Sequence, residues 1–158
     1  MQCDFGDRTK AFRQGIKFLI DNNDYEKFVK DYRFCLSVVG YVVYSSKKDG
    51  LNGKLLHRII MGDPDGQEVD HINVNPLDNR RENLRICSHH ENSFNRTKYS
   101  NNKSGFKGVY FDKQKQKFRA YINIDGKRKY LGYFDDPEEA HQAYCKAAIK
   151  LHGEFARF

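Results

Sequence analysis

The stretch Glu68-Val69-Asp70-His71-Ile72, followed by Leu84-Arg85-Ile86 and then by Ser88-His89-His90-Glu91, decides the fold of the middle of this chain. The first two segments carry β-branched and aliphatic residues between polar turns, which is typical of short strands. Ser88 and Glu91 form a capping box, so a helix is expected to begin near Ser88 and to carry Asn92 in its first turn. The predicted order is strand, long polar loop, strand and helix.

Asp70 and His71 place a carboxylate next to an imidazole on the first strand. Phosphodiester hydrolysis needs a base that activates water and a cation that neutralises charge at the phosphate. Adjacent strand residues point to opposite faces, so both can serve one site only where the strand bends. An Asp oxygen and the amide oxygen of Asn92 suit a hard ion such as Mg²⁺. Asn83, on the opposing strand, could brace His71.

Each of these signals is weak when it stands alone. An Asp-His pair is more often a polar strand end, and Asn73 and Asn79 are turn residues by default. His89 and His90 are either helix-surface residues or substitute metal ligands, and the surface interpretation is favoured. The sequence signal becomes specific only when these residues occur together, in this order along the chain.

The ordered set, Val69–Asn73, Asp78–Arg85 and Asn92–Asn95, closely resembles the HNH endonucleases, ββα-metal nucleases common in phage and mobile elements. Leu56-His57-Arg58 is similar to a further feature of that family, and the resemblance covers about residues 55–96, with a looser match back to about residue 17.

The resemblance implies specific roles for four residues. His71 would be the general base, Asp70 and Asn92 would bind a single divalent ion, and Asn83 would orient His71. Asn92 and Arg96 stand where some members have two helix histidines, which favours Mg²⁺ or Mn²⁺ over zinc or nickel. Arg58 is expected to contact DNA.

A second module follows a polar linker. The segments 107–111, 117–124 and 129–134 predict three strands, with a hairpin turn at Asp125-Gly126. A helix is expected between Asp136, as its cap, and Gly153, with Pro137 at its first position. An alanine-rich stripe lets this helix approach the sheet closely and leaves the other face of the sheet free.

Positive charge gathers on this module. Residues 97–134 hold ten Lys or Arg against two Asp, a net +8, whereas the whole chain carries +7. On the second strand the residues expected to face outward are Arg119, Tyr121 and Asn123, and Arg128 and Tyr130 share that face if the hairpin register is regular. Basic, aromatic and amide side chains together suit a groove of DNA.

The segments 105–109, 118–122, 130–134 and 138–148 look like the plant ethylene-response-factor (Apetala-two) DNA-binding domain, over about residues 104–155. That resemblance implies a three-stranded sheet in the major groove. Lys107 and Arg128 match basic contact residues of the domain, whereas the residues at other contact positions, Tyr110, Tyr121, Asn123 and Tyr130, differ in type. The plant target sequence is therefore not transferred.

Whole-chain properties complete the prediction. The four cysteines are scattered without a C-x-x-C pair, so structural zinc is not expected, and no signal peptide or membrane-length apolar run is seen. We expect an intracellular α+β protein, in a bacterial cytoplasm if phage-encoded. Its expected parts are a scaffold (1–54), an HNH core (55–97), a linker (98–103) and a DNA-binding domain (104–158).

The predicted function is a site-specific endonuclease or nickase that cuts double-stranded DNA, as a monomer if it nicks and as a dimer if it breaks both strands. The alternative is a DNA-binding regulator that retains an inactive HNH scaffold. It is disfavoured because Asp70, His71, Asn83 and Asn92 are all present. An RNA-binding protein is disfavoured because no single-strand stacking motif is recognisable. Removal of residues 104–158 is expected to reduce selectivity for the DNA site far more than it reduces the rate of cleavage.

Overall fold

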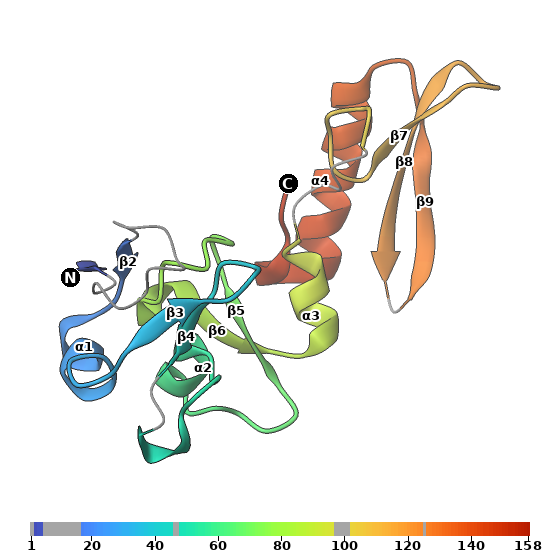
Figure 1. The fold of residues 1–158 in the computed structure, drawn as a ribbon. Helices are drawn as coiled ribbons and strands as arrows, with labels where there is room; N and C mark the ends of the chain where they lie inside the picture. The colour runs from blue at the N-terminus through green and yellow to red at the C-terminus, as the bar shows by residue number, and fades with distance from the viewer. Residues whose placement is uncertain (1, 5–16, 46–47, 97–101, 125) are drawn as a thin grey trace. The chain divides into compact units, whose positions relative to one another are not determined.

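The computed structural model describes residues 2–4, 17–45, 48–96, 102–124 and 126–158 of the 158-residue chain. These residues form two compact units, Met1–His89 and His90–Phe158 (Figure 1). The division falls at the start of α3 (His89–Phe94), so most of this helix, including Asn92, belongs to the second unit. Each unit is described by itself.

The first unit consists of short helices and three two-stranded antiparallel pairs. Its elements are β1 (Gln2–Asp4) paired with β2 (Lys17–Leu19), α1 (Asn22–Phe28), β3 (Phe34–Leu36) paired with β4 (Val42–Tyr44), a 3-10 turn η1 (Lys48–Gly50), α2 (Leu56–Ile60), and β5 (Glu68–His71) paired with β6 (Leu84–Cys87) through the 3-10 turn η2 (Arg81–Asn83).

One hydrophobic core serves the whole first unit. It joins Phe18, Phe34 and Tyr44 from the N-terminal part to Val69 and Leu84 of the β5–β6 hairpin. The Phe34 ring packs 4.7 Å from that of Tyr44 and 5.8 Å from that of Phe18. Because an isolated hairpin is at best marginally stable in water, this shared core is what allows β5 and β6 to hold their shape.

The second unit is a three-stranded antiparallel sheet with a helix on one face (Figure 1). The strands are β7 (Val109–Asp112), β8 (Lys117–Ile124) and β9 (Lys127–Phe134), and the helix α4 (Pro137–His152) ends in the 3-10 turn η3 (Gly153–Phe155). Ala120 and Ile122 of β8 are buried beneath Ala140, Tyr144 and Ala148 of α4.

The α+β class is confirmed, as are the strand, strand, helix order of the middle and the sheet and helix of the end. Asp136 caps α4 as expected, accepting a 3.0 Å hydrogen bond from the backbone N–H of Glu138. β1 had no sequence signal, and Leu56-His57-Arg58 proves to lie in the helix α2. Of the predicted linker 98–103 only 102–103 are described, and Asp125 of the hairpin turn also lies outside the described residues. None of the described helices is long and apolar enough to span a membrane.

Close packing of α4 on the sheet depends on Gly108, just before β7. Its φ is +76°, and a Cβ built there would lie 2.1 Å from Cδ2 of Tyr144, far inside van der Waals contact. Gly105, three residues earlier, also has a positive φ of +81° but meets nothing within 4 Å.

We therefore expect Gly108→Ala to destabilise the second unit by more than about 3 kcal/mol, because it adds a clash in the core to the strain of a positive φ. Gly105→Ala should cost only the backbone strain, about 1–2 kcal/mol. Urea unfolding followed by circular dichroism measures both. Equal losses for the two variants would contradict the proposed contact with Tyr144.

Candidate active site and nucleic-acid interface

Asp70 and His71 are both buried at the end of β5, with 6% and 4% of their surfaces exposed. The antiparallel register places Arg85 of β6 opposite Asp70. The guanidinium of Arg85 donates two hydrogen bonds to Oδ2 of Asp70, from Nε at 3.0 Å and from a terminal nitrogen at 2.8 Å. A buried carboxylate needs such a partner because unpaired burial of a charge is costly. Sequence reasoning missed this role of Arg85, although a regular hairpin register would have indicated it.

The ring of His71 packs against two other rings. Its centroid lies 4.7 Å from that of His57 on α2, in an edge-to-face arrangement, and 5.8 Å from that of Tyr41, which precedes β4. Burial lowers the pKa of His71 below its ordinary value; a hydrogen bond with Asn79 and the carboxylates of Asp70 and Asp78 oppose that shift without reversing it. The imidazole is therefore neutral at neutral pH.

His57 is buried as well, with 4% of its surface exposed. Burial, together with the neighbouring His71 and Arg58, lowers the pKa of His57 to about 3. Among the described residues its Nδ1 has no hydrogen-bond partner. An unpaired buried nitrogen typically costs about 1–3 kcal/mol, so a phenyl ring would serve packing alone better than this imidazole does.

The loop after His71 is held by a network of side-chain amides. Oδ1 of Asn83 accepts from the backbone N–H of Asn73 at 2.9 Å, and Nδ2 of Asn83 donates to Oδ1 of Asn73 and to the carbonyl of Asp78. Asp78, 2% exposed, accepts two hydrogen bonds from Arg80, which hold the pKa of the Asp78 carboxyl below its usual value. These contacts of Asn83 stabilise the loop that carries His71, and direct orientation of the His71 ring by Asn83 stays a prediction.

Asn79 is a functional candidate that the sequence did not distinguish from an ordinary turn residue. It is fully buried, its backbone N–H donates to the carbonyl of Leu19, and its side chain opposes the lowering of the His71 pKa. Nothing in the spacing separates Asn79 from the other loop asparagines, because its place beside His71 comes from the pairing of this loop with β2.

Arg58 lies on α2 with its guanidinium engaged inside the unit. Nε donates to Oδ1 of Asp63 at 2.8 Å, and the two terminal nitrogens donate to the carbonyls of Gln67 and Pro64. These contacts hold the turn between α2 and β5. Contact of Arg58 with DNA remains a prediction. The hydrogen bonds of its guanidinium within the unit give it a structural role as an alternative.

Helix α3 is fixed to the second unit. The Phe94 ring stacks on His152 of α4, with centroids 3.7 Å apart and planes 8° apart. The Lys107 amine donates to the carbonyl of Phe94 at 2.8 Å and lies 5.9 Å from the Tyr144 ring. Burial and Arg157 lower the pKa of Lys107 to about 8. The structure therefore does not bring Lys107 to the outer face of the sheet.

Asn92 lies in this helix and is partly buried. Since it belongs to the second unit, its role as a metal ligand with Asp70 stays a prediction. His89 and His90 are exposed; Nδ1 of His89 lies 2.6 Å from Oε1 of Glu68, and the ring of His90 packs on Phe94.

The donors suit a hard divalent ion. Asp70 offers a buried carboxylate and Asn92 an amide oxygen, the ligand types of ions that retain several waters. Within the described part of the chain, no three His, Cys, Asp or Glu side chains come close enough to hold a metal ion.

The outer face of the sheet carries most of the predicted DNA-contacting residues. The registers put Tyr110 opposite Arg119, Tyr121 opposite Tyr130 and Asn123 opposite Arg128, so these six side chains share one face. The pairing shifts at Ala120/Tyr121, yet the alternation of Arg119, Ala120, Tyr121, Ile122 and Asn123 between the faces holds, because Ala120 and Ile122 are the buried ones.

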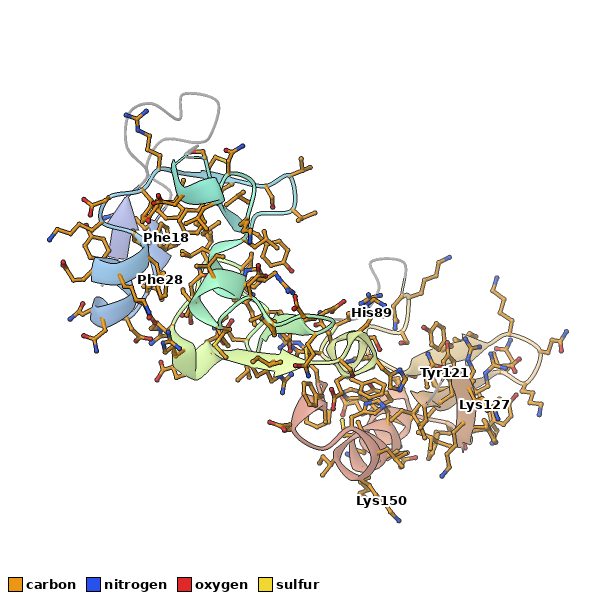
Figure 2. The ribbon with its side chains drawn as sticks, turned by 90° about the horizontal axis from the view of Figure 1, so that it is seen from below. Phe18, Phe28, His89, Tyr121, Lys127 and Lys150 are labelled. Carbon is orange, nitrogen blue, oxygen red and sulfur yellow. The ribbon has the colours of Figure 1, made fainter. Side chains whose placement is uncertain are left out.

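Tyr121 is the centre of this outer face. Its ring stacks on that of Tyr110, 4.8 Å away, and the Arg128 guanidinium lies 3.9 Å from it. Figure 2 shows Tyr121 on the sheet and Lys150 projecting from α4, on a different side of the second unit. Stacked tyrosine rings with a guanidinium group packed on them form a surface suited to contact with phosphates and nucleobase edges.

A hairpin and helix with a buried Asp-His pair, together with a basic three-stranded sheet, define a protein class that binds and processes nucleic acid. The family comparisons agree, since residues 54–94 match the HNH endonuclease model and residues 104–154 match the AP2 domain model. Both matches indicate DNA as the partner.

Two relatives extend this result. The chain is 33% identical over 130 residues to an uncharacterized HNH endonuclease, L560, of Acanthamoeba polyphaga mimivirus, covering 81% of this chain and 67% of that protein. It is 36% identical over 95 residues to protein 3.8 of Escherichia phage T7, covering 60% of this chain and 78% of that protein. No solved structure matches the chain significantly. The chain belongs to the HNH endonuclease family and carries an AP2 domain.

The buried state of His57 predicts a pH-dependent stability. The native form excludes a proton that the unfolded chain binds below pH 6.5, so stability should fall as pH decreases from 6.5 towards 3. A difference of one bound proton between the native and unfolded states changes the free energy of unfolding by about 1.4 kcal/mol per pH unit. Unfolding free energies of wild type and His57→Phe, measured from pH 7.5 to 4.5, should diverge in favour of the variant by roughly 2–3 kcal/mol at the acid end. A constant difference would mean that His57 protonates as readily in the native state.

Proposed function

We propose that this protein is a site-specific DNA endonuclease or nickase of the homing type, in which His71 acts as the general base. The observation that supports this most directly is the buried pair of Asp70 and a neutral His71 at the end of β5. A general base must be unprotonated before it acts, and burial keeps the imidazole in that form.

In this proposal His71 removes a proton from the attacking water, a contribution of about a hundred- to ten-thousand-fold in rate. Asp70 and Asn92 would hold one Mg²⁺ or Mn²⁺. When bound, that ion supplies positive charge for the scissile phosphate. Arg85 holds the Asp70 carboxylate in place on the hairpin through two hydrogen bonds. Asn83 holds the loop that follows His71. Asn79 acts on the ring of His71.

His71→Ala should lower plasmid cleavage by a hundredfold or more with Mg²⁺ or Mn²⁺, because the base is lost, while DNA affinity stays within about twofold. The measurement is conversion of supercoiled plasmid carrying candidate sites to nicked and linear forms. His89→Ala is the control, since this histidine is exposed and outside the buried group.

Two outcomes would overturn the proposal. Equal loss of cleavage in His89→Ala would mean that the loss is not specific to His71. A wild type that binds DNA tightly but leaves it intact with every divalent ion would favour the DNA-binding regulator with an inactive HNH scaffold. The ratio of nicked to linear product, as a function of protein concentration, separates a monomeric nickase from a dimeric double-strand cutter.

We assign target selection to the outer face of the β7–β9 sheet, through contact with double-stranded DNA. Arg119 and Arg128 would contact phosphate or guanine and Asn123 adenine, with Tyr110, Tyr121 and Tyr130 as the surface between them. The support is that these side chains share one face around the Tyr121 ring, opposite the face that α4 covers.

Arg128→Ala should weaken DNA binding and reduce the slope of log affinity against log salt by about one if Arg128 contacts a phosphate. Fluorescence anisotropy with a labelled duplex across a salt series measures both quantities. Lys150→Ala on α4 removes a comparable exposed charge away from the sheet and should leave both unchanged. Similar losses in the two variants would indicate binding through net charge rather than through this face.

A further inference from the structure

We propose that Tyr41 and His57 are positioning residues that hold the His71 ring in its productive orientation, which gives the N-terminal part of the chain a role in the reaction. This inference rests on the proposed function, in which His71 is the general base. Neither Tyr41 nor His57 touches the reacting atoms in this proposal; both act through the ring of His71.

The three rings form one cluster, the His71 clamp, made of Tyr41, His57 and His71. The centroid separations are 5.2 Å for Tyr41–His57, 4.7 Å for His57–His71 and 5.8 Å for Tyr41–His71, so each ring contacts the other two. The edge-to-face angle of 65° between His57 and His71 restricts rotation of the His71 imidazole about its Cβ–Cγ bond. A base must be aligned as well as unprotonated, and small misplacements cost up to about a hundredfold in rate.

Each member of the clamp comes from an element that is itself held in place. Tyr41 follows Gly40, whose φ is +89°, in the turn between β3 and β4. Its backbone N–H donates to Oγ of Ser37 at 3.0 Å, and its carbonyl accepts from the backbone N–H of Ser37 at 2.8 Å. His57 lies between Leu56 and Ile60 of α2, both of which are buried in the core.

The part of His57 that the His71 clamp uses is its ring. Among the described residues its Nδ1 is buried without a hydrogen-bond partner, so its contact with His71 is one of ring packing, which a phenyl ring also supplies. His57 is also 96% buried on a short helix that contacts β5, the strand of the candidate site. The sequence showed His57 only as part of Leu56-His57-Arg58, with no sign of a partner fourteen residues away.

The experiment compares full-length variants for kcat, KM and melting temperature with plasmid or duplex substrate. His57→Ala and Tyr41→Ala should each lower kcat by about ten- to a hundredfold, with KM and DNA affinity within about twofold, because only the alignment of His71 is lost. His57→Phe and Tyr41→Phe retain a ring and should recover kcat to within about threefold of wild type.

Ile60→Ala is the matched control, since it removes buried volume from the same helix but keeps all three rings of the His71 clamp. It should lower the melting temperature at least as much as His57→Ala while leaving kcat within about twofold. If Ile60→Ala loses kcat to the same extent, the effect is general destabilisation and the proposal is wrong. It is also wrong if folded His57→Ala keeps the wild-type kcat, or if His57→Phe is as slow as His57→Ala.

A double substitution separates this inference from the proposed function. In a His71→Ala background, adding His57→Ala should cause no further loss, because the positioning acts through the missing ring. An inactive His71→Ala with a fully active His57→Ala refutes the His71 clamp and leaves the proposed function standing. An active His71→Ala refutes both.

Discussion

Two neighbouring residues of one strand, Asp70 and His71, are both buried, although a strand directs them to opposite sides. Each side of the strand must then be covered by side chains that stabilise the buried group, a carboxylate on one side and an imidazole on the other. Arg85 neutralises the carboxylate from the paired strand. His57 and Tyr41 close the other side with rings that leave the imidazole neutral. A two-stranded hairpin has no core from which to supply such groups, so β5 and β6 depend on the N-terminal strands and helices of the first unit.

The same dependence governs the polar loop between β5 and β6. Of the twelve residues 72–83, only Arg81–Asn83 form a helical turn, so this loop would ordinarily be solvated, yet Asp78, Asn79 and Asn83 are all buried. The side chains of Asp78 and Asn83 hydrogen-bond within the loop, and Leu19 of β2 exchanges backbone hydrogen bonds with residues 77 and 79. Arg81 adds a bidentate ion pair with Asp24 of α1. The scaffold therefore orders the loop as well as the strand that carries His71.

Local rules explain why much of this was predictable. The helix start near Ser88, the Asp136 cap and the alternation of Arg119, Tyr121 and Asn123 each depend on a few consecutive residues, and the structure agrees with all three. The partners of His71 were not predictable, because Tyr41 and His57 reach it only through tertiary packing. Lys107 was predicted to contact DNA by its place in a motif, whereas its amine donates a hydrogen bond to the carbonyl of Phe94. Side-chain direction just before a strand is not fixed by strand periodicity.

The attachment of α3 changes how the two functions can be separated. Phe94 is stacked on His152 and its carbonyl is bound by Lys107, so the helix that carries Asn92 is packed on the AP2 unit. Removing residues 104–158 would strip α3 of both supports, and a helix of six residues is not stable alone. Such a deletion would therefore impair the helix that carries the candidate metal ligand together with the proposed target selection, which argues against a loss of selectivity much larger than the loss of chemistry. Substitutions on the outer face of the sheet, away from Lys107 and His152, separate the two functions because they leave the supports of α3 in place.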